Sequence, residues 1–334
     1  MKRTKGIISI IMTAVMCLAL ASCGGGGDQG GSDAGDATYN VGICQLVQHD
    51  ALDSATQGFK DAITEELGDA VTFDEQNAQG DSAVCSTIVN GFVSNNYDLI
   101  MANATPALQA AVSATSDIPI LGTSVTDYGA ALEMEIDPAA GTGINVSGSS
   151  DGVPGEQYAG LVKELIPDAK KVSILYCSAE ANSKVQSDDF EAAMKEAMPD
   201  AECTVFTFAD SNDIQSVVTS AIAECDALYI PTDNQAASNI SIIKNVCEPA
   251  KVPIIAGEEN MCAGGGLATV SINYHDIGYA CGQQAVKILR DGEDVTKMPI
   301  EYASDPVKEY NAEYAEAIGF EVPDTYKAIE IQAE

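Results

Sequence analysis

The sequence predicts an α/β protein with two similar lobes, each built on a parallel sheet, joined by a hinge. From residue 40 onward, short apolar runs alternate with longer amphipathic runs, a pattern typical of strands alternating with helices in parallel sheets. The alternation occurs twice, before and after a segment around residues 145–150. With 334 residues, the chain is long enough for more than one hydrophobic core. We therefore expect two Rossmann-like lobes.

The N-terminal segment has the features of a lipoprotein export signal. A basic start precedes the apolar run 7–21, which is too short for a membrane span. The run ends in LASC, which resembles a bacterial lipobox. We predict a signal peptide at 1–22, a lipidated Cys23, and a flexible Gly/Ser/Asp tether over 23–38. The lipid would be the chain's only membrane contact, on the extracytoplasmic face.

The first lobe is expected to begin with the buried strand 41–47 and the amphipathic helix 53–67. Its apolar residues recur at helical spacing in that helix, and Pro106 stands where a helix tolerates proline, in the first turn. The remaining expected elements are strands at 71–77, 99–104 and 119–125 and helices at 81–95 and 106–114.

The second lobe repeats the pattern, and the chain then returns to the first. Helix 277–289 is expected to lie in the first lobe, and a strand near 299–303 to cross back. We therefore assign 39–147 with 276–297 to lobe 1, and 148–275 with 298–334 to lobe 2. The expected elements of the second repeat are strands at 172–177, 203–209, 227–231 and 253–257 and helices at 154–165, 183–197, 212–223 and 236–247.

Composition argues against several classes of function. A formal charge of -34 repels phosphate backbones, so no nucleic-acid partner is expected. His49 and His275 are the only histidines, no CxxC pair occurs, and no glycine-rich run continues as a phosphate loop. We therefore predict a binding protein rather than an enzyme, with no cofactor and no metal. The eight cysteines beyond Cys23 are expected to be mostly free thiols.

Several ordered motifs resemble one family. They include QLVQHDALD, NATPALQAA, LGTSVTD, NVSGSSDGVP and LYIPTDNQAAS, within a likeness that spans about residues 40–325. The sequence resembles the ABC-transporter substrate-binding proteins that include tryptophan- and phenylalanine-binding receptors, on the type I periplasmic-binding fold. Two positions depart from the family pattern, because Asp50 and Tyr128 stand where members often have proline.

The resemblance implies a receptor that closes two lobes on an aromatic amino acid (Phe, Tyr or Trp). It would then deliver the ligand to a membrane permease driven by an ATPase, and act as a monomer. The alternatives are a branched-chain amino acid, a nucleoside or a sugar as ligand, or a sensory protein without a transport role.

Candidate ligand contacts follow the strands, because ligands of open α/β sheets bind beyond the strands' carboxyl ends. An amino-acid carboxylate suits hydroxyls and a helix N-terminus, and an ammonium suits carboxylates or amide oxygens. The candidates for the carboxylate are Thr105, Thr123 and Ser183, those for the ammonium Asp233 and Glu180, those for either group Asn182 and Asn234, and those for the side-chain pocket Gln45, His49 and Tyr128.

These candidates also have purely structural interpretations. Thr105 and Asp233 are suited to cap the helices that follow them, and Glu180 belongs equally to a solvated loop or a cap. His49 is as well explained as a structural histidine, and Tyr128 as an exposed loop residue.

Overall fold

The computed structural model describes residues 38–303 and 306–330. The predicted signal peptide, Cys23 and most of the tether lie outside the described residues. Within those ranges, no helix combines the length and apolar character needed to cross a membrane. The segment Thr38–Glu334 is one compact unit.

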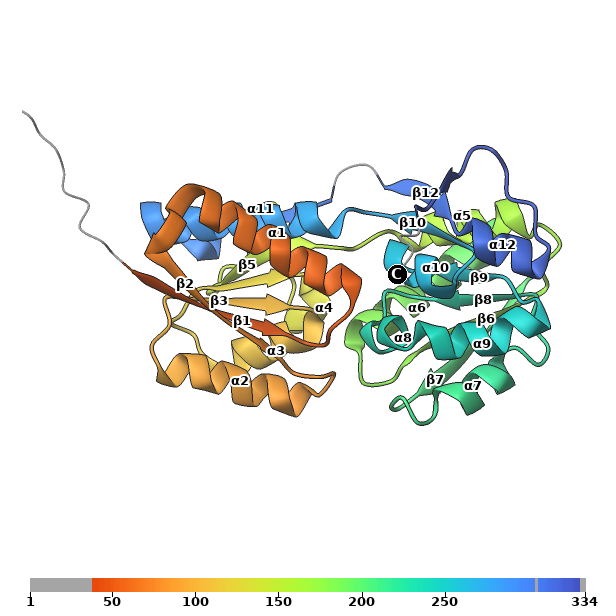
Figure 1. Ribbon diagram of the computed structural model, residues 1–334, viewed down its shortest axis with the longest axis horizontal. Helices are drawn as coiled ribbons and strands as arrows, with labels where there is room; N and C mark the ends of the chain where they lie inside the picture. Colours follow the sequence, from red (N-terminus) through yellow and green to blue (C-terminus); the bar gives the residue numbers. More distant parts are fainter. Residues whose placement is uncertain (1–37, 304–305, 331–334) are drawn as a thin grey trace, which may run out of the picture. The chain divides into compact units, whose positions relative to one another are not determined.

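The first lobe is a parallel sheet covered by helices. Its strands are β1 (Tyr39–Gln45), β2 (Val71–Asn77), β3 (Leu99–Asn103), β4 (Ile120–Thr123), β5 (Val146–Ser150) and β11 (Ile300–Tyr302). Its helices are α1 (Asp50–Leu67), α2 (Ser82–Ser94), α3 (Thr105–Ala114), α4 (Tyr128–Leu132) and α11 (Tyr274–Asp291). The strand order is β11-β5-β4-β3-β1-β2, and every neighbouring pair is parallel. Figure 1 shows α1 and α11 on one face and α2 and α3 on the other.

The second lobe is built in the same way. Its strands are β6 (Lys171–Cys177), β7 (Glu202–Phe208), β8 (Ala227–Ile230), β9 (Ile254–Ala256), β10 (Ala268–Ser271), β12 (Val307–Tyr310) and β13 (Lys327–Ala328). Its helices are α5 (Gly155–Leu165), α6 (Ala181–Ala197), α7 (Ile214–Ala221), α8 (Asn234–Ser238), α9 (Ile240–Ala250), α10 (Glu259–Gly265) and α12 (Ala312–Ile318). The order is β13-β12-β10-β9-β8-β6-β7, with only β10 and β12 antiparallel. The predicted fold class is confirmed.

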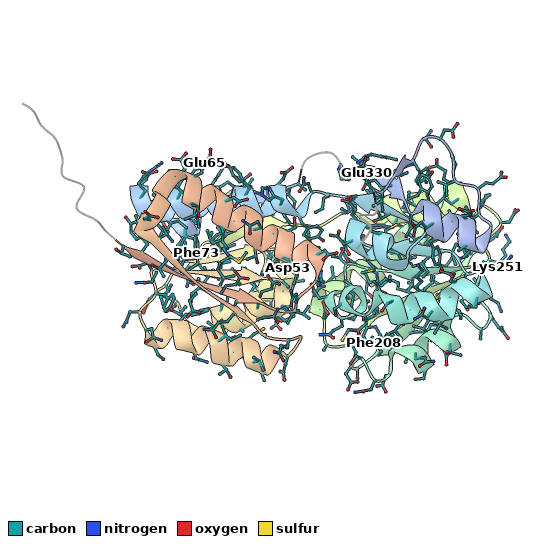
Figure 2. All side chains as sticks on the ribbon, viewed as in Figure 1. Asp53, Glu65, Phe73, Phe208, Lys251 and Glu330 are labelled. Carbon is teal, nitrogen blue, oxygen red and sulfur yellow. The ribbon has the colours of Figure 1, made fainter. Side chains whose placement is uncertain are left out.

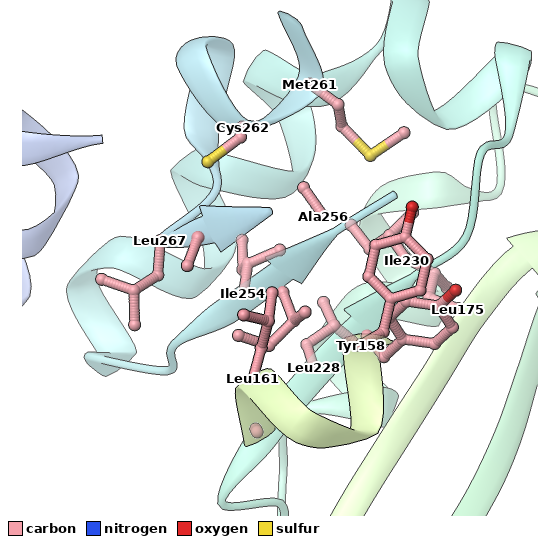
Figure 3. Packing of buried hydrophobic residues seen from close by; sticks show 14 of the residues in the cluster. Tyr158, Leu161, Leu175, Leu228, Ile230, Ile254, Ala256, Met261, Cys262 and Leu267 are labelled. Atoms are coloured by element: carbon pink, nitrogen blue, oxygen red, sulfur yellow. The ribbon is translucent and has the colours of Figure 1, made fainter. Parts of the chain in front are cut away.

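Continuous apolar strands form the centre of each lobe, because helices cover both sheet faces. In the second lobe, Leu228 and Ile254 from neighbouring strands pack against Leu161 and Tyr158 of α5 (Figure 3). Tyr229 stacks on Phe190 of α6, with 4.0 Å between the ring centroids. These contacts fix the sheet whose strand ends carry the polar residues described below.

One strand lies in a different lobe from the one the sequence indicated. Residues 298–334 were assigned to lobe 2, but β11 pairs with β5, with Ile300 opposite Gly148. The Ile300 side chain is buried in the core of the first lobe, which explains the placement. The chain therefore crosses to the second lobe after β11. Residues 148–150 were also assigned to lobe 2, but they belong to β5 of the first lobe, where Gly148 pairs with Gly122 of β4. The other predicted lobe boundaries stay a prediction.

Helices α1 and α11 lie side by side with their backbones in close approach (Figure 1). A side chain at Gly58 of α1 would collide with the backbone of His275, and one at Gly278 of α11 with the backbone of Ala55. Glycine at these positions lets the two helices pack directly on each other.

Candidate functional site

A cavity with about 280 Å³ of space not filled by atoms lies at the carboxyl ends of strands from both sheets. Figure 2 shows side chains of the two lobes facing one another, with Asp53 of α1 labelled on the first-lobe side. This volume includes space that is open to solvent. The lining residues are His49, Leu52, Ser124, Thr126, Asp151, Asn182, Thr232, Asp233, Asn234, Ala237, Glu258 and Tyr274.

His49 joins the cavity to the opposite lobe. It directly precedes α1, and its Nε2 lies 3.2 Å from the Oδ1 of Asn234 in α8. Its Nδ1 is buried and has no partner in the described chain. Burial lowers the pKa of His49, although the bond to Asn234 opposes this effect. The imidazole is therefore neutral at pH 7 and leaves one nitrogen for a ligand.

The rest of the first-lobe lining lies beyond β4 and β5. Ser124 adopts a left-handed backbone conformation with φ 53°, and its buried Oγ has no partner among the described residues. The Asp151 carboxylate accepts hydrogen bonds from Thr126 Oγ1 (3.0 Å) and Tyr274 OH (3.0 Å). Burial raises the pKa of Asp151, and these two hydrogen bonds oppose the rise.

In the second lobe, the Asp233 carboxylate is held by its own lobe. Its Oδ1 accepts from the Ala236 N–H (2.8 Å), and its Oδ2 accepts from the Cys177 N–H (2.7 Å) and Ser183 Oγ (2.7 Å). Burial raises the pKa of Asp233, and these N–H donors oppose the rise. Asp233 therefore ties together the ends of β6, α6 and α8.

A third acidic residue, Glu258, caps α10. Its carboxylate accepts from the Asn260 N–H at 2.7 Å and from the Met261 N–H. Burial raises the pKa of Glu258 to about 7. Glu258 also lines an open groove that adjoins the cavity.

The cavity is acidic. Asp151, Asp233 and Glu258 line it, each at most 4% exposed, and its lining includes no lysine or arginine. A buried carboxylate needs a partner of opposite charge or hydrogen-bond donors. This site is therefore suited to a ligand that carries a cationic, donor-rich group.

Among the sequence candidates, His49, Asn182, Asp233 and Asn234 line the cavity. Glu180 and Ser183 lie directly behind this lining and bind Asn234 and Asp233, respectively.

The other candidates have partners away from the cavity. The Tyr128 OH donates to the Gly122 carbonyl (2.8 Å) inside the first lobe. Gln45 bonds to Asp53 and Thr56, and Thr123 bonds to Ser149. Thr105 is buried at the start of α3 and is not among the cavity-lining residues. Whether any of the ten candidates binds a ligand stays a prediction.

More than half of the polar lining was not included among the sequence candidates. Asp151 follows β5 and Glu258 follows β9, so the rule of strand ends applies to both. Ser124, Thr126 and Thr232 stand in the motifs quoted above, as do the apolar residues Leu52 and Ala237, whereas Tyr274 lies outside those motifs.

The structure places no cluster of three or more His, Cys, Asp or Glu suited to a metal ion within 38–303 and 306–330. The eight cysteines beyond Cys23 are free thiols in the structure, as the sequence indicated.

Comparison with known proteins identifies the family. The family described as ABC transporter substrate binding protein matches residues 40–329. The chain belongs to this family. It is a substrate-binding protein of an ABC transporter, so the prediction of a binding protein rather than an enzyme is confirmed. It is 36% identical, over 90% of its length and 88% of the relative's, to a tyrosine-binding protein of Clostridioides difficile (strain R20291).

Two solved structures are also similar over nearly their whole length. One is an ABC domain from Streptococcus pneumonia in complex with L-Trp, with TM-score 0.82, 32% identity, and coverage of 87% of this chain and 100% of the other. The second is the ligand-free, open structure of a substrate-binding protein with adhesive properties from Clostridium difficile. Its TM-score is 0.66, with 35% identity and coverage of 88% and 100%.

Proposed function

We propose that this substrate-binding protein captures an aromatic amino acid, Phe, Tyr or Trp, in the cavity between its two sheets. The observation that carries the proposal is the acidic lining without a cationic side chain, which suits an α-ammonium group. The proposal is also supported by relatives that are described as tyrosine-binding and as bound to L-Trp.

The ligand's other groups have suitable neighbours in both lobes. The 18-residue helix α1 has no side-chain cap, so the N–H groups of its first turn are available to a carboxylate. Leu52, Ala237 and the Tyr274 ring offer apolar surface to an aromatic side chain. The hydroxyl of Ser124, which has no protein partner among the described residues, is free for a polar group.

Capture by lobe closure is supported by bonds that join the lobes around the cavity. His49 meets Asn234 at 3.2 Å, and Gln235 Nε2 donates to the Gly80 carbonyl at 3.2 Å. The TM-score is higher against the L-Trp complex than against the ligand-free, open relative, although both are similar in identity and coverage. We infer that the arrangement described here is the closed one, and that ligand stabilises it over an open form.

The cellular setting is part of the same proposal. A lipid on Cys23 would hold the monomer at the extracytoplasmic face, the tether over 23–38 would give it reach, and a permease with its ATPase would receive the ligand. Cys23→Ser should release the chain from the membrane fraction, and unchanged membrane association would refute the anchor.

Isothermal titration and thermal unfolding of residues 38–334 test the ligand. A ligand at 100 times its Kd should raise the unfolding free energy by about 2.7 kcal/mol. We expect a selective response to Phe, Tyr or Trp. Asp151→Asn should weaken the affinity for that amino acid by about 10-fold or more, because a charge-assisted hydrogen bond to the ligand is lost. Asp127→Asn, at an exposed first-lobe aspartate, is the matched control. A response to branched-chain amino acids, nucleosides or sugars alone would refute the aromatic ligand.

A further inference from the structure

Glu180 lies behind the cavity, where it accepts hydrogen bonds only from N–H groups. It is 3% exposed, and its Oε1 accepts from the Gln235 N–H at 2.9 Å. Its Oε2 accepts from the Asn234 backbone N–H (3.1 Å), Asn234 Nδ2 (2.6 Å) and Asn182 Nδ2 (3.3 Å). Each of these groups can donate and none can accept, so Glu180 is held as an acceptor on both oxygens. Burial and the neighbouring Asp233 raise the pKa of Glu180 to about 8, and the donors of Asn234 and Gln235 oppose that rise.

This carboxylate fixes the direction of a chain of hydrogen bonds to the cavity. Because Asn234 must direct its Nδ2 at Glu180, its Oδ1 faces His49 Nε2 at 3.2 Å. An amide oxygen only accepts, so Nε2 carries the imidazole proton. A neutral imidazole has one N–H, which leaves Nδ1 as a bare acceptor. That Nδ1 is the buried atom without a protein partner at the cavity.

Asn182 is oriented by the same carboxylate. Its Nδ2 donates to Glu180 Oε2 and to the Thr232 carbonyl at 2.9 Å. Its Oδ1 is therefore the remaining atom, and it too is buried at the cavity without a partner in the described chain. Glu180 thus orients Asn234 and, together with the Thr232 carbonyl, Asn182, so it acts on two cavity atoms that come from opposite lobes.

We propose that Glu180 is a positioning residue that, through Asn234 and Asn182, presents His49 Nδ1 and Asn182 Oδ1 as acceptors for the amino group of the ligand. The inference rests on the proposed function, because it assigns the orientation of an amino-acid ligand in that cavity. An ammonium group has three N–H donors, enough for both acceptors and one carboxylate. A ligand with an acceptor at this point would leave both protein atoms unpaired, which is costly when they are buried.

Titration calorimetry with three ligand pairs tests the proposal. Each pair is an aromatic amino acid and its analogue without the amino group: tyrosine and 3-(4-hydroxyphenyl)propionate, phenylalanine and 3-phenylpropionate, tryptophan and indole-3-propionate. The wild-type domain should prefer the amino acid by about 100-fold or more. Glu180→Gln places an amide N–H against the donors of Asn234 or Gln235, so this preference should fall below about 10-fold. A purely structural defect would weaken both members of a pair equally.

Glu191→Gln is the matched control, because this α6 residue is ion-paired with Lys195 on the surface. It should keep the wild-type preference. Equal binding of both members of a pair by wild type would overturn the proposal while leaving an aromatic ligand in place. An undiminished preference in Glu180→Gln would overturn it as well, and would assign the amino group to Asp151 or Glu258.

A measurement without ligand keeps the proposal testable if the variant does not fold or if no aromatic compound binds. The chain contains two histidines, so ¹⁵N-labelled imidazole signals are simple to assign. The wild-type spectrum should show His49 as the neutral form protonated at Nε2. A His49 protonated at Nδ1 would refute the chain of hydrogen bonds. Failure of every aromatic pair with the expected spectrum would refute the proposed function and, with it, the amino-group assignment.

Discussion

The two lobes contribute to the cavity in different ways. In the second lobe the polar lining is bonded internally, since Asp233 accepts three hydrogen bonds and Asn182 donates to Glu180 and Thr232. In the first lobe, Ser124 Oγ and His49 Nδ1 have no protein partner in the described residues. The second lobe therefore has a largely preformed polar surface with one unpaired lining atom among the described residues, Asn182 Oδ1, whereas the first lobe keeps two atoms whose pairing requires a ligand. Substituting a polar cavity residue should accordingly lower the stability of the protein when the residue is in the second lobe, and lower ligand affinity when it is in the first.

The largest expected difference concerns two aspartates that cap helices. Asp233→Ala leaves three buried donors unpaired, at about 1–3 kcal/mol each, and should lower the unfolding free energy by about 4 kcal/mol or more. Asp127→Ala in the first lobe removes one exposed cap bond to the Ala130 N–H and should cost about 1 kcal/mol. Urea unfolding of both variants measures the contrast. Equal losses would show that the second-lobe network adds nothing to an ordinary cap.

A smaller effect is expected from the charge of Glu258 and depends on pH. Its pKa is raised from 4.5 to about 7 in the folded protein, so the unfolded chain ionises first. The contribution to stability is therefore largest below about pH 4.5 and is lost as pH rises to about 7. The full loss is about 3 kcal/mol. Glu258→Gln should remove this part of the decline.

The measurement is the unfolding free energy of ligand-free protein between pH 5 and pH 8. Glu156→Gln, at an exposed site on α5, is the control and should retain the wild-type pH slope. A Glu258→Gln variant with the wild-type slope would mean that Glu258 is not the group that loses a proton in this range.

The smallest effect separates two serines. Ser124→Ala removes a buried hydroxyl without a protein partner, so stability should change by less than about 0.5 kcal/mol while ligand affinity falls about fivefold. Ser183→Ala should instead cost about 1–2 kcal/mol of stability, because the hydroxyl donates to Asp233. Thermal unfolding measures the stability of both variants, and titration calorimetry measures their ligand affinity. A stability loss at Ser124 as large as that at Ser183 would contradict the contrast between the lobes.

The sequence was sufficient to predict the fold because buried parallel strands are continuous apolar runs. LIMAN of β3 and ALYI of β8 are buried along their whole length. β11 was assigned to the wrong lobe because a three-residue strand carries no information about its pairing partner. Its position depends on burial of Ile300 in a core that forms only in three dimensions.

The site was only partly predictable, because the rule of strand ends gives no direction for a side chain. Thr123 ends β4 and Tyr128 follows it, yet both side chains point into the first lobe. Thr123 bonds to Ser149, and Tyr128 donates to the Gly122 carbonyl. Asp151 was missed because its strand, VSGSS, lacks an apolar signal. Glu258 follows a predicted strand but was not chosen as a candidate, because the pair Glu258-Glu259 is uninformative in a chain with 50 acidic residues.

The close packing of α1 on α11 has a mechanical consequence. The backbones of the two helices are in contact at Gly58 and Gly278. The helices therefore resist sliding along each other and move as one rigid unit. His49 adjoins the first turn of α1 and Tyr274 begins α11. Both cavity residues therefore lie at the same end of this helix pair. When the lobes move relative to each other, the distance between the His49 and Tyr274 side chains stays the same. The bending must then be absorbed in the short connections outside the helices, and their composition should set how fast the protein opens.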